Sequence, residues 1–187
     1  MGIKVNQETL QMIADLSNAR GASGFEDETV QAAAKHIGEG YTTEEDCLRN
    51  FYMYRTANSG NKPVFMLDAH SDEVGFMVHS IRPNGTLRFV ALGGWNVGSL
   101  ASSKVLVRNS EGKYLPGVIA AKPVHFMSAS EKASAGAADI SSLSIDIGAV
   151  SAKDAAENFK IRIGEPGVPD VTLEYDEEHD LMFGKAF

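Results

Sequence analysis

Three polar side chains at a spacing of two could form one metal-binding site. Asp68, His70 and Asp72 follow a run of four apolar residues, 64–67, which predicts a strand buried on both faces. Alternate residues of an extended chain point to the same side, so the three polar side chains could project into one site. In open α/β sheets, ligands bind at the carboxyl ends of strands, where this group lies.

In such a site His70 and Asp72 would have complementary roles. One ring nitrogen of His70 can bind a metal ion, while Asp72 can accept the proton of the other nitrogen and so fix the tautomer. An H-x-D triplet is short and arises often by chance, however. A hydrogen-bonded histidine in a loop therefore stays an alternative on the triplet alone.

Composition excludes several classes of function. The chain has 187 residues, enough for one domain or two small ones, and a net charge of −8. A general nucleic-acid partner is not expected, because phosphate contacts need a basic face and no Lys/Arg cluster is present. Cys47 is the only cysteine, which excludes an intrachain disulfide framework and a thiolate zinc cluster.

The sequence also gives no sign of a membrane partner. The N-terminus lacks the basic-then-apolar pattern of a signal peptide, and no apolar run approaches the ~18 residues of a membrane span. We therefore predict a cytoplasmic location.

The first 60 residues predict two helices and a strand pair. Apolar residues at helical spacing predict a helix over residues 6–19. Ser23 and Glu26 have the spacing of a capping box, so a second helix is expected to begin at Ser23 and to end before Gly38. Side-chain character alternates loosely along residues 43–57, which is typical of paired strands.

After Gly75 the pattern changes to short strands separated by turn residues, which indicates a small β barrel or sandwich. The expected strands are residues 76–81, 86–92, 104–108, 118–121 and 145–148. Ser151 is expected to cap a short helix that ends near Asn158. Residues 171–183 predict a hairpin around an acidic turn. The predicted fold class is an α/β domain interrupted by a β insert.

Several motifs resemble those of one enzyme family, in the same order along the chain. They are residues 21–26 (GASGFE), 69–76 (AHSDEVGF), 93–95 (GGW), 116–125 (PGVIAAKPVH), 145–149 (IDIGA), 161–164 (IRIG) and 184–187 (GKAF). The sequence resembles the N-terminal half of a tetrahedral-type di-zinc aminopeptidase, a family that includes glutamyl aminopeptidases and endoglucanase-like metallopeptidases.

This resemblance implies a division into two domains. Residues 1–73 and 171–187 correspond to part of an α/β metallopeptidase domain. Residues 74–170 correspond to an inserted β-barrel dimerisation domain. The implied partners are peptide substrates and further copies of the chain, which would assemble through the insert. The implied cofactor is zinc or cobalt, with two ions in the complete enzyme.

The resemblance also assigns roles to individual residues. His70 matches the family's first zinc ligand, and Asp72 matches the aspartate that orients it. Asp68 and Glu73 are possible further contacts around the site. Asp68 could form either a tight ion pair or an additional hydrogen bond. His125 lies in the insert, where a hydrogen-bonded loop histidine is expected rather than a catalytic one.

The sequence departs from the family at its end. The family continues past residues 184–187 with a bridging Asp, a Glu-Glu pair that provides the general base and one ligand, another Asp and a last His. Catalytic zinc sites use about three protein ligands, so His70 alone is not expected to hold a catalytic ion. The chain contains four further glutamates that do not obviously substitute, namely Glu26, Glu73, Glu177 and Glu178.

Three hypotheses of function follow, in order of preference. The first is a metal-dependent aminopeptidase that removes N-terminal residues from peptides, present here as an incomplete N-terminal portion that is inactive alone. The second is a non-catalytic remnant that acts as a dimerisation or binding module. The third is a glycoside hydrolase, which needs two carboxylates ~5–9.5 Å apart across a cleft, and the sequence offers no convincing pair.

Overall fold

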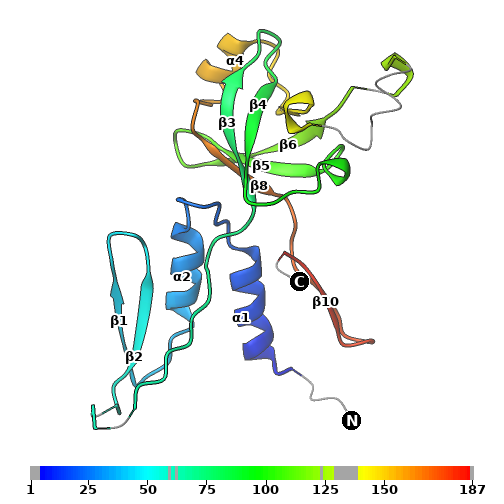
Figure 1. The fold of residues 1–187 in the computed structure, drawn as a ribbon. Coiled ribbons are helices and arrows are strands. Elements are labelled where there is room, and N and C mark those ends of the chain that lie inside the picture. Colours follow the sequence, from blue (N-terminus) through cyan, green and yellow to red (C-terminus); the bar gives the residue numbers. More distant parts are fainter. Residues whose placement is uncertain (1–4, 59, 62, 123, 129–138, 186–187) are drawn as a thin grey trace. The chain divides into compact units, whose positions relative to one another are not determined.

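The chain divides into two compact units. The computed structural model describes residues 5–58, 60–61, 63–122, 124–128 and 139–185. One unit, here called the split unit, comprises Met1–Asp72 and Thr172–Phe187. The other, here called the barrel unit, comprises Glu73–Val171. Figure 1 shows the elements of both units, coloured in their order along the chain.

The barrel unit is a closed barrel of six short strands in the order β3-β4-β7-β6-β5-β8. All its strand pairs are antiparallel. Because the barrel is closed, none of these six described strands has a free edge for pairing with another chain. The inserted small barrel predicted from the sequence is confirmed. Its strands are β3 (Gly75–Ile81), β4 (Leu87–Leu92), β5 (Lys104–Arg108), β6 (Tyr114–Ala120), β7 (Ser144–Asp146) and β8 (Pro166–Pro169).

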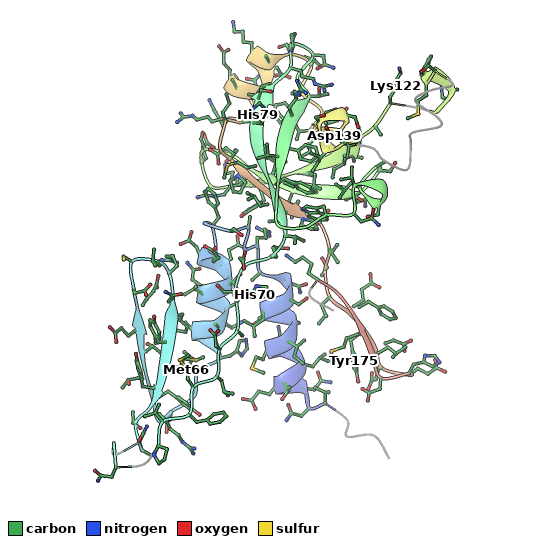
Figure 2. All side chains as sticks on the ribbon, in the orientation of Figure 1. Met66, His70, His79, Lys122, Asp139 and Tyr175 are labelled. Atoms are coloured by element: carbon green, nitrogen blue, oxygen red, sulfur yellow. The ribbon has the colours of Figure 1, made fainter. Side chains whose placement is uncertain are left out.

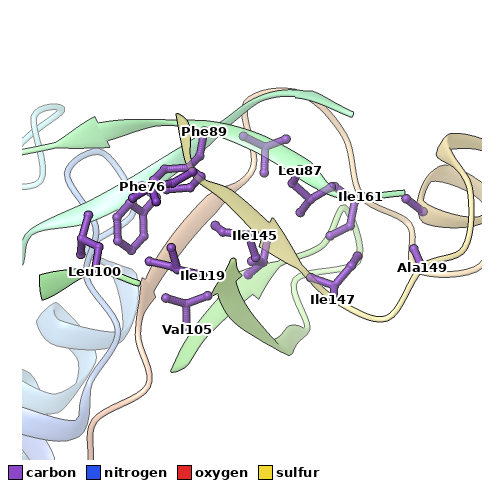
Figure 3. Packing of buried hydrophobic residues seen from close by; sticks show 14 residues of the cluster. Phe76, Leu87, Phe89, Leu100, Val105, Ile119, Ile145, Ile147, Ala149 and Ile161 are labelled. Atoms are coloured by element: carbon purple, nitrogen blue, oxygen red, sulfur yellow. The ribbon is translucent and has the colours of Figure 1, made fainter. Parts of the chain in front are cut away.

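The barrel encloses its own hydrophobic core (Figure 3). The side chain of Phe76 lies edge-on to Phe89, with ring centroids 4.9 Å apart, and stacks on Trp95 at 4.7 Å. The indole nitrogen of Trp95 donates to the carbonyl oxygen of Gly75 at 3.0 Å, so this half-buried side chain keeps its polar partner. The other large core side chains include Leu87, Leu100, Val105, Val107, Ile119, Ile145 and Ile161.

Short helices complete the barrel unit. Helix α4 (Ala152–Glu157) begins after Ser151, whose hydroxyl oxygen accepts from the backbone N–H of Asp154, as predicted. Such a cap satisfies one of the free N–H groups of the first turn. The described 3-10 helices are η1 (Val97–Ser99), η2 (Val124–Phe126) and η4 (Ile140–Ser142).

The split unit contains helices and two separate hairpins. The predicted first helix, strand pair and C-terminal hairpin are all present. The hairpins pair β1 with β2 and β9 with β10, both antiparallel. The elements are α1 (Gln7–Asn18), α2 (Asp27–Lys35), β1 (Tyr41–Glu45), β2 (Phe51–Arg55), β9 (Glu174–Asp176) and β10 (Leu181–Phe183).

The strand predicted for residues 64–67 is wrong for this structure. Residues 63–72 form neither helix nor strand, and the apolar side chains of 64–67 are 77–88% exposed. Four consecutive apolar residues become a buried strand only where strands lie on both sides and other elements cover both faces. The described residues of the split unit supply neither for this segment.

The predicted start of the second helix is also wrong. Helix α2 begins at Asp27, with Glu26 at the N-cap position. The N–H of Phe25 donates to the carbonyl oxygen of Ala22 at 2.7 Å, and Gly24 has φ of +87°. Gly24 thus has the left-handed backbone conformation, which glycine adopts readily. The turn that contains it places Ser23 before the helix. Its hydroxyl is therefore free for another partner.

Within the described part of the chain, none of the helices is long and apolar enough to cross a membrane.

Candidate functional site

His70 and Asp72 lie within hydrogen-bonding distance in the split unit. The Nδ1 atom of His70 is 2.9 Å from Oδ1 of Asp72 and 3.0 Å from the main-chain oxygen of Asp72. Two acceptors at Nδ1 favour a proton on that nitrogen, which leaves the lone pair of Nε2 unprotonated in the neutral ring. The imidazole is 85% exposed, so Nε2 is accessible to a metal ion. Figure 2 shows His70 on the extended segment that leads from the hairpin to the barrel unit.

Ser23 is a third member of this group, and sequence reasoning assigned it to a helix cap instead. Its hydroxyl donates to Oδ2 of Asp72, across 49 residues of sequence. The carboxylate is thereby held at both oxygens, by Ser23 and by His70. The Ser23 hydroxyl and then the His70 ring lower the pKa of Asp72 below its ordinary value, so the carboxylate stays ionised at neutral pH.

The loop that carries Ser23 is fixed on both sides. Before it, the N–H and the guanidinium of Arg20 each donate to the carboxylate of Glu28 on α2 at 3.2 Å. Next to it, a Cβ atom on Gly21 would lie 3.3 Å from the carbonyl oxygen of Ser71 and would collide with the hydroxyl of Thr29. The absence of a side chain at Gly21 therefore lets this loop approach the segment of His70 and Asp72.

Asp68, the other candidate on this segment, is not joined to this group. Asp68 is exposed and has no hydrogen bond or ion pair with any described residue, so neither contact expected for it is formed there. Glu73 is half-buried and belongs to the barrel unit. His125 also belongs to the barrel unit, where its ring lies 4.5 Å from that of Phe126.

The Ser23–Asp72–His70 group has the arrangement of one ligand of a metal site and the residues that orient it. Metal-binding histidines usually donate their second ring N–H to a carboxylate, as His70 does here. A catalytic zinc ion uses about three protein ligands. Among the described residues, however, no three His, Cys, Asp or Glu side chains come together to hold an ion. The described residues therefore supply one oriented ligand but not a complete ligand set.

A second histidine makes the same contact elsewhere in the split unit. In the turn between β9 and β10, Nδ1 of His179 lies 2.8 Å from Oδ2 of Asp176, and this hydrogen bond lowers the pKa of Asp176. The histidine is 63% exposed. An imidazole with an orienting carboxylate is thus not unique to His70, and His179 provides a matched control for it.

Comparison with known proteins finds similarity to one family of peptidases. A family profile described as M42 glutamyl aminopeptidase matches residues 50–187. Glutamyl aminopeptidase of Lactococcus lactis is 34% identical over 121 residues, which cover 64% of this chain and 34% of the relative. Putative aminopeptidase FrvX of Escherichia coli is 36% identical over 131 residues, which cover 70% and 36% of the two chains.

Solved structures give the same result. The TET aminopeptidase of a marine sediment Thaumarchaeota archaeon superposes with a TM-score of 0.82 at 29% identity, over 91% of this chain and 46% of that one. Aminopeptidase APDkam598 of Desulfurococcus kamchatkensis gives a TM-score of 0.79 at 27% identity, over 92% and 46%. The chain therefore matches between about a third and about half of the length of these relatives.

Proposed function

Because the chain belongs to the M42 glutamyl aminopeptidase family, we propose that it is the part of a metal-dependent aminopeptidase that supplies His70 as a metal ligand. The observation that carries the proposal is the hydrogen-bonded series Ser23–Asp72–His70. It holds one imidazole with its proton on Nδ1 and its Nε2 accessible. The proposed substrates are peptides, from which the enzyme removes N-terminal residues.

Each residue of the series has a separate task. His70 would hold the ion, zinc or cobalt, through the ring nitrogen that does not face Asp72. Asp72 is a positioning residue: as an ionised acceptor at Nδ1, it fixes the tautomer and makes the ring a better electron donor. Ser23 holds Asp72 in place. When bound, an ion of this kind polarises a carbonyl group and acidifies a bound water.

The remaining ligands and the general base are proposed to come from outside residues 1–187. The chain matches 46% of the archaeal structure with a TM-score of 0.82, so more than half of that protein has no counterpart here. We therefore expect this chain alone to bind zinc weakly and to hydrolyse no peptide. A general base commonly accelerates a reaction by ~10²–10⁴-fold, so its absence alone would lower the rate of hydrolysis by a similar factor.

A second candidate function is a dimerisation or binding module. It is favoured by the barrel unit, which closes on itself and has its own core. On this alternative, the barrel unit would associate with other copies or partners without any catalysis. Assembly through the barrel unit is also compatible with the peptidase proposal, so activity is the property that separates the two.

The test is an amide-release assay on aminoacyl p-nitroanilides with added Zn²⁺ or Co²⁺. It compares the 187-residue chain with an extended chain, in which residues 1–187 continue into the portion of a family member that has no counterpart here. We expect metal-dependent release only by the extended chain, and its loss in His70→Ala. No release by a folded, metal-loaded extended chain would favour the binding module. Metal-dependent release by the short chain would show that our ligand count is wrong.

A further inference from the structure

The end of helix α1 is hydrogen-bonded to the segments on both sides of the β9–β10 hairpin. Before the hairpin, the backbone N–H of Leu173 donates to the side-chain oxygen of Asn18 at 2.7 Å. After it, the hydroxyl of Ser17 donates to the carbonyl oxygen of Lys185 at 3.0 Å, and the ammonium group of Lys185 donates to the carbonyl oxygen of Ala19 at 2.9 Å. These contacts join residues that are 155 to 168 positions apart in the sequence.

Gly184 allows the close approach of the chain to α1. A Cβ atom at this position would lie 2.8 Å from Cδ1 of Leu173 and 3.0 Å from the hydroxyl oxygen of Ser17. A larger residue would therefore displace one of these contacts. Gly184 and Lys185 are the first two residues of the GKAF motif, and together they bring an ammonium group to the end of the helix.

Lys185 supplies a cation that the end of α1 lacks. The last turn of this helix contains no basic residue. The last carbonyl groups of a helix carry a partial negative charge and have no partner within the helix, so a cation that donates to one of them is favourable. Lys185 makes this contact at Ala19, the C-cap residue, where ψ of 144° turns the chain out of the helix.

The other polar atom of the same peptide group is held by α2. The carbonyl oxygen of Ala19 and the N–H of Arg20 belong to one planar peptide. Its oxygen accepts from Lys185 at 2.9 Å, and its N–H donates to Oε2 of Glu28 at 3.2 Å. Because both polar atoms of this plane are held, the direction in which the chain leaves α1 toward Ser23 is set.

We infer that Lys185 is a positioning residue for His70 and that it acts through Ser23. Ser23 is only four positions after Ala19, so a rotation of the peptide held by Lys185 moves the hydroxyl that donates to Asp72. The other carboxylate oxygen of Asp72 lies 2.9 Å from Nδ1 of His70. The inference rests on the proposed function for the role of His70 as a ligand, but the state of its ring can be measured without a metal.

The experiment measures the tautomer of His70 in the full 187-residue chain, without metal, by long-range ¹H–¹⁵N correlation spectra at a pH at which the ring is neutral. Lys185→Met keeps the length of the side chain and removes its donors. We expect the ratio of the Nδ1–H form to the Nε2–H form to fall by about two- to tenfold, as for the loss of one hydrogen bond. Lys185→Arg keeps a cationic donor and should restore most of the ratio.

Asn18→Ala is the control for a merely structural role of Lys185. It also removes a hydrogen bond between α1 and the hairpin, but it leaves the contact of Lys185 in place. Both Asn18→Ala and Lys185→Met should lower the free energy of unfolding in urea, whereas only Lys185→Met should change the tautomer of His70. His179, whose carboxylate partner lies in the same turn, shows in the same spectra that the hairpin remains folded.

A double variant tests whether the effect passes through Ser23. Once Ser23→Ala has removed the hydroxyl, Lys185→Met should change the tautomer ratio of His70 no further, because residues that act through one contact are not additive.

Three results would overturn the inference. The first is an unchanged His70 tautomer in Lys185→Met, the second is an equal change in Asn18→Ala, and the third is a full additional change in the double variant. Competitive zinc titration of the extended chain tests the proposed function separately. A changed tautomer with unchanged zinc affinity would contradict His70 as the metal ligand and would leave the positioning role of Lys185 intact.

Discussion

The hydroxyl of Ser23 donates a hydrogen bond to one carboxylate oxygen of Asp72, while the other oxygen of Asp72 lies 2.9 Å from Nδ1 of His70. The proposed metal ligand is thus fixed by a residue two positions away and by another that is 47 positions before it. Since the loop of Ser23 is tied to α2 by Arg20 and Glu28, the orientation of His70 depends on the packing of that loop.

We predict that Ser23→Ala weakens metal binding without preventing folding. Asp72 would lose the donor that holds its second oxygen, and losses of such outer contacts typically cost 10–100-fold in metal affinity. We expect the lower end, about tenfold, because His70 and Asp72 remain in contact. The measurement is competitive zinc titration of the extended chain. Ser23→Thr keeps a hydroxyl and is the control; equal affinities for Ser23→Ala and the unchanged protein would contradict the proposed contact.

Asp72→Asn should move the proton on the neutral His70 ring. The carboxylate accepts from Nδ1, whereas the introduced amide can donate to it, which would shift the proton to Nε2. Long-range ¹H–¹⁵N correlation spectra of the 187-residue chain above pH 8 distinguish the two tautomers. We expect the Nδ1–H form in the unchanged chain and a larger share of the Nε2–H form in the variant. The same tautomer in both proteins would show that Asp72 does not orient the ring.

The barrel was predictable from sequence because its signals are local. Short apolar runs separated by turn residues specify strands, and Ser151 caps α4 as its position in the sequence suggests. The conformation of residues 64–67 could not be predicted in this way. An apolar run becomes a buried strand only through neighbours that the described part of the split unit does not supply. The same limit applies to Ser23. Its spacing from Glu26 is that of a capping box, but the turn at Gly24 and the position of Asp72 decide its contact.

The β3–β4 turn supplies a stability prediction for the barrel. Gly85 has φ of +88°, and a Cβ there would collide with the carbonyl group of Ala149, 2.6 Å from its carbon. Gly148 has φ of +84°, but a Cβ there would meet nothing within 4 Å. Gly148→Ala should therefore cost only the backbone strain, ~1–2 kcal/mol in the free energy of unfolding.

Gly85→Ala should cost the same strain plus the collision, about 1–3 kcal/mol more. Urea unfolding followed by the fluorescence of Trp95, which packs on the barrel core, measures both variants. Equal destabilisation by the two substitutions would show that the turn shifts away from Ala149 at no cost.

The hydrogen bonds of Asp15 lead to a prediction of how the stability of the split unit depends on pH. Its carboxylate accepts from Lys35 Nζ at 2.6 Å, His36 Nε2 at 2.8 Å and Gln11 Nε2 at 2.7 Å. The hydrogen bond from Lys35, then those from His36 and Gln11, lower the pKa of Asp15 far below its ordinary 3.8. Stability from this carboxylate is therefore fully present above the unfolded-state pKa and is lost as pH falls through the folded-state pKa.

Asp15→Asn should accordingly destabilise α1 and α2 at pH 6, with the difference from the unchanged chain fading as pH falls below 3.8. Urea unfolding followed by circular dichroism at the helical minimum provides the measurement. Glu8→Gln removes a charge from an exposed position of the same helix and is the control. A difference that persists unchanged at the lowest pH would exclude the carboxylate as its source.

The most direct test of the account is the metal content of the extended chain after dialysis against metal-free buffer. His70 and His179 each have Nδ1 beside a carboxylate, at 2.9 Å and 2.8 Å, so the two histidines differ in location rather than in their local pair. We predict that the unchanged protein and His179→Ala retain equal amounts of zinc, while His70→Ala loses it. Full retention by His70→Ala, or loss in His179→Ala, would contradict the assignment of His70 as the metal ligand.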